Sequence, residues 1–155
     1  MLKNVTPLLS PDLLKVLAEM GCGDELVIAD GNFPAAAVAR RLIRADAATV
    51  NALLDAVLSV IPLDAKVEMP LALLSSGAAI GADTNGKPAE PPAWERLRYL
   101  VERHEGERMF QILERDVFIE RSKRAYAIVA TGDREVCSVI LRKGLIVLDG
   151  REYRL

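Results

Sequence analysis

The chain has 155 residues, with 20 Lys and Arg against 22 Asp and Glu, and a formal net charge of -2. This length indicates one domain over residues 1–155 with a real core, and the charge lacks the basic excess that nucleic-acid backbones require. No apolar run approaches the roughly 18 residues of a membrane span, and the first residues lack the pattern of a signal peptide. We therefore expect a cytoplasmic protein without membrane or nucleic-acid partners, whose two cysteines are thiols.

The first predicted element is a helix over residues 11–20. Ser10 precedes a proline and an aspartate, which is typical of a helix start. Leucines, a valine and a methionine then recur at helical spacing and give one apolar face. Gly21 follows, and we expect it to end the helix in the left-handed conformation.

Residues 26–29, Leu-Val-Ile-Ala, are too short and too evenly apolar for an amphipathic helix, so they predict a buried strand. Asp30 follows this strand directly and opens a Gly-Asn-Phe-Pro loop at 31–34. In open α/β sheets, ligand sites form around the carboxyl ends of strands. Asp30 is therefore the first candidate for chemistry, although the same pattern also fits an aspartate that caps a turn.

The rest of the chain alternates between helices and strands. Residues 35–45 are ambiguous between an alanine-rich helix and a short strand, and 75–92 form a long glycine- and proline-rich loop. Further helices are predicted at 46–61, from Trp94 to His104 and at 116–124, and further strands at 67–74, 109–113, 126–130 and 136–141. The alternation predicts a three-layer α/β/α domain around a mostly parallel sheet.

Several kinds of chemistry find no support in the motifs. The chain has one histidine, two distant cysteines, no phosphate-binding loop and no nucleophile elbow, so we expect neither a metal nor another cofactor. His104 fits a solvated helix end. Asp30 together with Arg115 and Arg121 suits a polyhydroxylated ligand, because a carboxylate accepts from hydroxyls and a guanidinium donates to them. The alternative is that the arginines form surface ion pairs.

Two blocks of the chain resemble the L-fucose mutarotase and D-ribose pyranase family. The first block, within 1–70, includes Asp-Gly-Asn-Phe-Pro at 30–34, and the second, within 114–147, includes Ile-Leu-Arg-Lys-Gly at 140–144. Arg-Ala-Asp at 44–46 is more similar to the fucose branch. The resemblance implies a cofactor-free enzyme that interconverts anomers or ring forms of a free, L-fucose-like monosaccharide. It also implies a ring-shaped homodecamer with pockets near the subunit contacts.

The resemblance also assigns residues to roles. Asp30 and Arg115 match the family's sugar-binding aspartate and arginine. Cys22 stands where the family has a proton-donating histidine, so the resemblance makes Cys22 and Asp30 the candidate acid and base. A thiol with a pKa near about 8.5 is a weaker proton donor at neutral pH than an imidazole near about 6.5.

A second departure from the family lies before the last strand. Cys137, Ser138 and Val139 stand where the family has a sugar-binding Tyr-Gly-Asn or Tyr-Ala-Asn triplet, and a valine offers a sugar no side-chain hydrogen bond. Both cysteines thus fall on pocket positions of the family. They are either ordinary buried cysteines, or a thiol at Cys22 that replaces the imidazole, or a redox- or metal-sensitive pair across a subunit contact.

Three functional interpretations remain open. The first is a monosaccharide mutarotase with Asp30 and Arg115 as polar anchors. The second is a non-catalytic sugar-binding or regulatory paralogue, which the loss of the histidine favours. The third is a pocket for a less polar ligand, which Val139 and Ile119 would suit.

Overall fold

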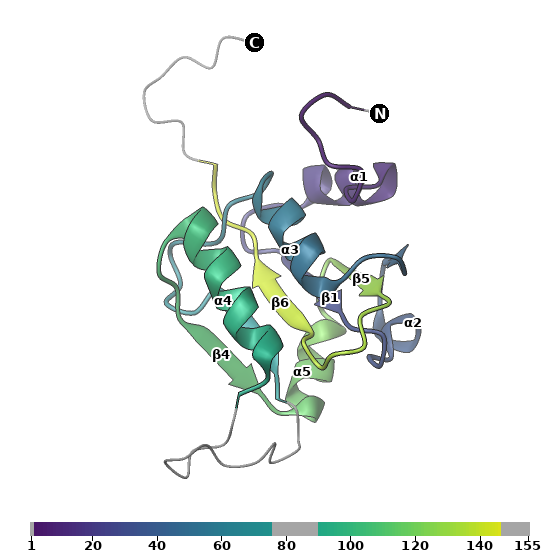
Figure 1. The fold of residues 1–155 in the computed structure, drawn as a ribbon, viewed down its shortest axis with the longest axis vertical. Coiled ribbons are helices and arrows are strands. Elements are labelled where there is room, and N and C mark those ends of the chain that lie inside the picture. Colours follow the sequence, from purple (N-terminus) through teal and green to yellow (C-terminus); the bar gives the residue numbers. More distant parts are fainter. Residues whose placement is uncertain (1, 76–89, 147–155) are drawn as a thin grey trace.

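The computed structural model describes residues 2–75 and 90–146, which form one six-stranded sheet covered by helices (Figure 1). The strand order is β2-β5-β1-β6-β3-β4. The elements are α1 (Pro11–Glu19), β1 (Glu25–Ala29), α2 (Ala35–Val38), β2 (Leu42–Ala45), α3 (Val50–Leu58), β3 (Leu71–Leu74), α4 (Pro92–Glu105), β4 (Phe110–Leu113), α5 (Arg115–Ser122), β5 (Ala127–Thr131) and β6 (Val139–Arg142).

The sheet is mostly parallel, as predicted. Strands β2, β5 and β1 pair in parallel, as do β3 and β4, whereas β6 pairs antiparallel with β1 on one side and with β3 on the other. Strands β1 to β5 therefore end at one edge of the sheet, where β6 begins. We call this the carboxyl edge and the opposite one the amino edge.

Each face of the sheet carries its own apolar core. Leu26 and Ile28 of β1 face the core formed with α1, α3 and α4, whereas Val27 and Ala29 face the smaller core beneath α2 and α5. Figure 1 shows α3 and α4 on the near face and α5 behind the sheet. Because both faces of β1 are buried, its sequence is evenly apolar rather than alternating. The predicted three layers are confirmed.

Helix α1 begins as predicted but ends differently. The Ser10 hydroxyl accepts the backbone N–H of Leu13 at 3.2 Å. The prediction that Gly21 adopts the left-handed conformation is wrong, since the positive φ, 90°, occurs at Gly23. The chain leaves the helix through an extended Met20 and turns only afterwards, where the Asp24 carboxylate accepts the Gly21 N–H at 2.7 Å.

The ambiguous segment 35–45 contains both predicted elements. A four-residue helix, α2, comes first and strand β2 follows it. Helix α3 is shorter than predicted because Thr49 caps it, accepting the Ala52 N–H at 3.2 Å. Residues 76–89 of the predicted loop lie outside the described residues.

His104 lies in the last turn of α4, as predicted, but it is less solvated than predicted. Its side chain is half-buried, and its Nε2 lies 2.6 Å from Oδ1 of Asp55 on the neighbouring helix α3. The hydrogen bond from His104, aided by Arg103, lowers the pKa of Asp55. His104 therefore joins α4 to α3.

None of the described helices combines the length and the apolar character that crossing a membrane requires.

Candidate functional site

The carboxyl edge brings Asp30 and Ser138 into direct contact. Asp30, which is 2% exposed, follows β1, and Ser138 precedes β6, which pairs with β1. The Asp30 Oδ2 accepts the Ser138 hydroxyl at 2.6 Å and the backbone N–H groups of Ser138 and Cys137 at 3.1 and 3.2 Å. These donors hold the carboxylate in one orientation, so Asp30 does more than cap its own turn.

The two oxygens of the Asp30 carboxylate differ in the number of hydrogen bonds that they accept from the described residues. Oδ2 accepts three hydrogen bonds, whereas Oδ1 accepts the Asn32 N–H at 3.0 Å and no other bond from the described residues. A carboxylate oxygen has about two acceptor sites. Oδ1 therefore keeps one acceptor site for a ligand.

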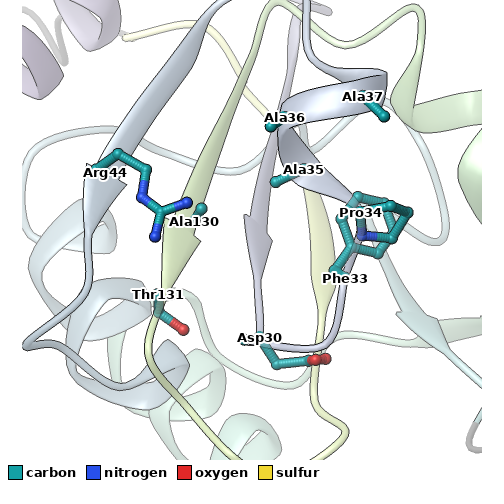
Figure 2. A pocket seen from close by; sticks show the side chains of 10 residues that line it. Asp30, Phe33, Pro34, Ala35, Ala36, Ala37, Arg44, Ala130 and Thr131 are labelled. Atoms are coloured by element: carbon teal, nitrogen blue, oxygen red, sulfur yellow. The ribbon is translucent and has the colours of Figure 1, made fainter.

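A cavity of about 290 Å³ lies beside Asp30 on the α2 side of the sheet (Figure 2). This volume is close to the lower end of the range for small-ligand sites. Figure 2 shows Arg44 of β2 on one side of the cavity and the segment from Phe33 to Ala37 on the other. The lining residues are Asp30, Gly31, Phe33, Pro34, Ala35, Ala36, Ala37, Arg44, Ala130 and Thr131.

Sequence reasoning missed Arg44 as a site residue. The signal that could have found it is its position near the end of the strand of the 35–45 segment. In a parallel sheet, that position lies at the same edge as Asp30. The structure pairs Arg44 with Ala130 of β5, and β5 lies next to β1.

Cys137 and Val139 are both fully buried. The Cys137 Sγ lies 3.3 Å from the carbonyl oxygen of Glu135 and 3.6 Å from Oδ2 of Asp133. Burial, together with the charges of Asp133 and Asp30, raises the pKa of the Cys137 thiol, so it stays protonated. Val139 lies in the core with α1, α3 and α4 and therefore presents no apolar surface to a ligand of this chain.

Arg115 lies at the carboxyl edge, but it does not line the cavity. It is the first residue of α5, is exposed, and makes no hydrogen bond or ion pair with the described residues. Strand β4, which precedes it, is three positions from β1, about 14 Å away. The connection to the site runs through Phe118, one turn further along α5, whose ring meets Phe33 edge-on at 5.7 Å.

Cys22 lies at the amino edge, away from Asp30, Arg115 and Cys137. It is an exposed thiol in the turn before β1, whereas Asp30 follows β1. The five residues of that strand extend about 17 Å. Within one chain, Cys22 and Asp30 therefore cannot contact the same sugar, and Cys22 and Cys137 cannot form a pair.

Arg121 also lies near the amino edge. Its guanidinium binds both carboxylate oxygens of Glu25, with Nη2 2.7 Å from Oε1, and Nη1 donates to Gln111 at 3.0 Å. The alternative of an ion pair is therefore correct for Arg121, and the structure does not bring it together with Asp30.

Within the described residues, no three His, Cys, Asp or Glu side chains gather as a metal site would require.

Comparisons with known proteins agree over nearly the whole chain. A family model described as the RbsD / FucU transport protein family matches residues 3–146. The chain is 41% identical over 152 residues to the fucose mutarotase of Homo sapiens, which covers 96% of each protein. It is 40% identical over 147 residues to the L-fucose mutarotase of Actinobacillus pleuropneumoniae serotype 5b (strain L20), covering 94% of this chain and 97% of that protein.

Solved structures show the same likeness. The crystal structure of the fucose mutarotase in complex with L-fucose from Streptococcus pneumoniae is similar with a TM-score of 0.84 and 41% identity, covering 94% of this chain and 100% of that one. The structure of Bacillus subtilis RbsD complexed with D-ribose is similar with a TM-score of 0.68 at 21% identity, covering 95% of this chain and 100% of that one. The second likeness, at that identity, shows the fold alone.

Proposed function

Because the chain belongs to the RbsD / FucU family, we propose that it is a mutarotase that interconverts the anomers or ring forms of a free, L-fucose-like monosaccharide without a cofactor. The observation that carries this proposal is the near-full-length likeness to proteins named fucose mutarotase, one of them solved with L-fucose bound. The cavity supports it, because Asp30, whose carboxylate is held in one orientation, lines it at the carboxyl edge of an α/β sheet.

Ring opening of a sugar needs one group to protonate the ring oxygen and another to take the proton from the anomeric hydroxyl. Asp30 suits the second role, because Oδ1 keeps an acceptor site while the bonds to Oδ2 prevent the carboxylate from turning. Arg115 does not line this cavity in its own chain, but its guanidinium is exposed and unpaired among the described residues and can donate hydrogen bonds to sugar hydroxyl groups.

The proton donor is the residue in which this chain differs from the family. Cys22 stands at the position of that donor, and it lies about 17 Å from Asp30, at the other end of the five-residue strand β1. A Cys22 that serves the sugar held by Asp30 must therefore come from a neighbouring copy. This separation supports the homo-oligomer, a decamer in our proposal. Its two free thiols suit the reducing cytoplasm, where we place the reaction.

Saturation-transfer exchange between the anomers of L-fucose and related monosaccharides tests this function. We expect the protein to speed exchange above the buffer rate, by a modest factor, because acid or base groups contribute about 10²- to 10⁴-fold each and a thiol is a weak donor. Exchange at the buffer rate across the whole sugar panel would exclude catalysis.

A non-catalytic sugar-binding paralogue is the second candidate. The observation that favours it is the exposed thiol of Cys22 at the position of the family's histidine. Calorimetry separates the two candidates, because tight binding of a monosaccharide without any acceleration of exchange would select the paralogue.

A further inference from the structure

The cavity beside Asp30 has one charged wall that the proposed chemistry does not use. Arg44 lies on the edge strand β2, in register with Ala130 of β5. Figure 2 shows its guanidinium extending over Ala130 toward the cavity. The Asp46 carboxylate holds this guanidinium through Nε and Nη2, at 3.4 and 2.5 Å. Within the described residues, no group bonds to Nη1, so it keeps two donors for a ligand.

The opposite wall is apolar. It consists of Phe33 and Pro34 followed by three alanines at 35–37. Helix α2 has only four residues, and its alanines have small side chains, which leaves room for the cavity beside Ala130. The cavity is thus the space between a short helix and the edge strand. It has guanidinium donors on one side and carbon atoms on the other.

We propose that Arg44 is a substrate-binding residue and that the apolar wall opposite it sets specificity for 6-deoxyhexoses, an inference that rests on the proposed mutarotase function. The free donors of Arg44 bind hydroxyl groups on one edge of the sugar. The wall from Phe33 to Ala37 receives the methyl group on the other edge. A hexose with a hydroxymethyl group in that place buries a hydroxyl against carbon without a partner, which is unfavourable.

The alternative is that Arg44 serves only its ion pair with Asp46. Both side chains are 61% exposed, so this pair contributes little to stability. An Arg44→Met variant should therefore fold as well as the wild type. The effect of this substitution on substrate binding can therefore be measured kinetically in a folded protein.

The experiment compares Arg44→Met with a matched control, Arg40→Met, in the assembled protein. Arg40 is also exposed and precedes β2, but it does not line the cavity and has no bonded partner among the described residues. Anomer exchange gives kcat and KM for L-fucose and for L-galactose, which carries a hydroxymethyl group where L-fucose carries a methyl group. Thermal melting of each variant shows whether the fold is kept.

For Arg44→Met we expect a KM for L-fucose raised at least about tenfold, as the loss of a charged hydrogen bond predicts, with kcat within about twofold. The control should match the wild type, and the wild type should prefer L-fucose to L-galactose by about 10- to 100-fold. A KM for Arg44→Met equal to that of Arg40→Met, in an active protein, would overturn the role of Arg44 and leave the proposed function standing. A wild type that neither binds nor exchanges any sugar would overturn both.

A second variant tests the apolar wall independently. Ala36→Leu places a larger side chain in the cavity from an exposed helical position, and Ala18→Leu on α1 is its control because Ala18 is exposed and lies outside the cavity. We expect Ala36→Leu to raise the KM for L-fucose at least about tenfold without lowering the melting temperature, and Ala18→Leu to leave both unchanged. An unchanged KM in Ala36→Leu would show that the sugar does not occupy this cavity.

Discussion

Ser138 and Asp30 hydrogen-bond to each other in both directions. The Ser138 hydroxyl donates to Asp30 Oδ2 at 2.6 Å and accepts the backbone N–H of Asp30 at 2.9 Å, across 108 positions of sequence. Both residues are buried. The pair joins the end of β1 to the start of β6 and fixes the carboxylate in the orientation that the proposed base requires.

Ser138→Ala should weaken both folding and catalysis. It removes one of three donors to Oδ2 and leaves the Asp30 N–H without its acceptor, so we expect the free energy of unfolding to fall by about 1–3 kcal/mol. Urea unfolding measures the first effect, and anomer exchange should show a lower kcat. Ser59→Ala is the control, because its hydroxyl donates to the Ala56 carbonyl at the end of α3, far along the chain from the site. Equal stability of the two variants would contradict the role of the pair.

The two thiols should differ in reactivity. Cys22 is exposed, whereas Cys137 is fully buried and burial raises the pKa of its thiol. Because the thiolate is the reactive form, a disulfide reagent should label Cys22 in the native protein and reach Cys137 only after unfolding in urea. In Cys22→Ser, we expect no labelling before unfolding. Native labelling of Cys137 at the rate of Cys22 would rule out this assignment.

Cys22→His should increase the rate of anomer exchange. An imidazole exchanges protons near neutral pH far more readily than a thiol, so a gain of up to about 10²-fold is expected if position 22 supplies the acid. Cys22→Ser is the control, since a serine hydroxyl does not titrate in this range. If the histidine variant exchanges anomers no faster than the serine variant, position 22 is not the proton donor.

Asp64 should make stability depend on pH in the acid range. The hydrogen bond from the Lys66 N–H, at 3.0 Å, together with the Arg142 guanidinium at 2.9 Å, lowers the pKa of Asp64 below its ordinary 3.8 despite burial. A lowered folded-state pKa adds stability above the ordinary value, and this contribution disappears as the pH falls through the folded-state value. Urea unfolding should therefore show wild type and Asp64→Asn converging between about pH 5 and pH 2.

Glu102→Gln is the control for this acid effect. Glu102 is exposed on α4, and its side chain has no bonded partner among the described residues. The difference in unfolding free energy between this variant and the wild type should stay constant over the same pH range. A constant difference for Asp64→Asn as well would contradict the role of Asp64.

The fold was largely predictable because its strands are short, apolar and separated by helices. Residues 26–29 identified β1, and the aspartate that follows them identified the carboxyl edge. Even the separation of Cys22 from Asp30 was visible in the sequence, since a strand lies between them. The left-handed residue was misplaced because two glycines, Gly21 and Gly23, flank Cys22, and only the geometry of the turn chooses between them.

The partners of Asp30 and the position of Arg44 could not be read in the same way. Ser138 contacts Asp30 because β6 lies antiparallel beside β1. The sequence pattern predicts a strand near this position, but it does not predict which strands lie next to it. Arg44 lines the cavity together with α2, an element whose type the sequence left undecided. His104 was misjudged for a similar reason, because its partner Asp55 lies on another helix.

Strand β6 is among the last described segments of the chain, yet it sits in the middle of the sheet between β1 and β3. Without residues 139–142, the described strands would fall into two separate groups, β2-β5-β1 and β3-β4. During synthesis on the ribosome, the sheet therefore cannot close until residues 139–142 have emerged. Chains that stop before residue 139 expose two unpaired strand edges, which makes premature termination products targets for chaperones and proteases.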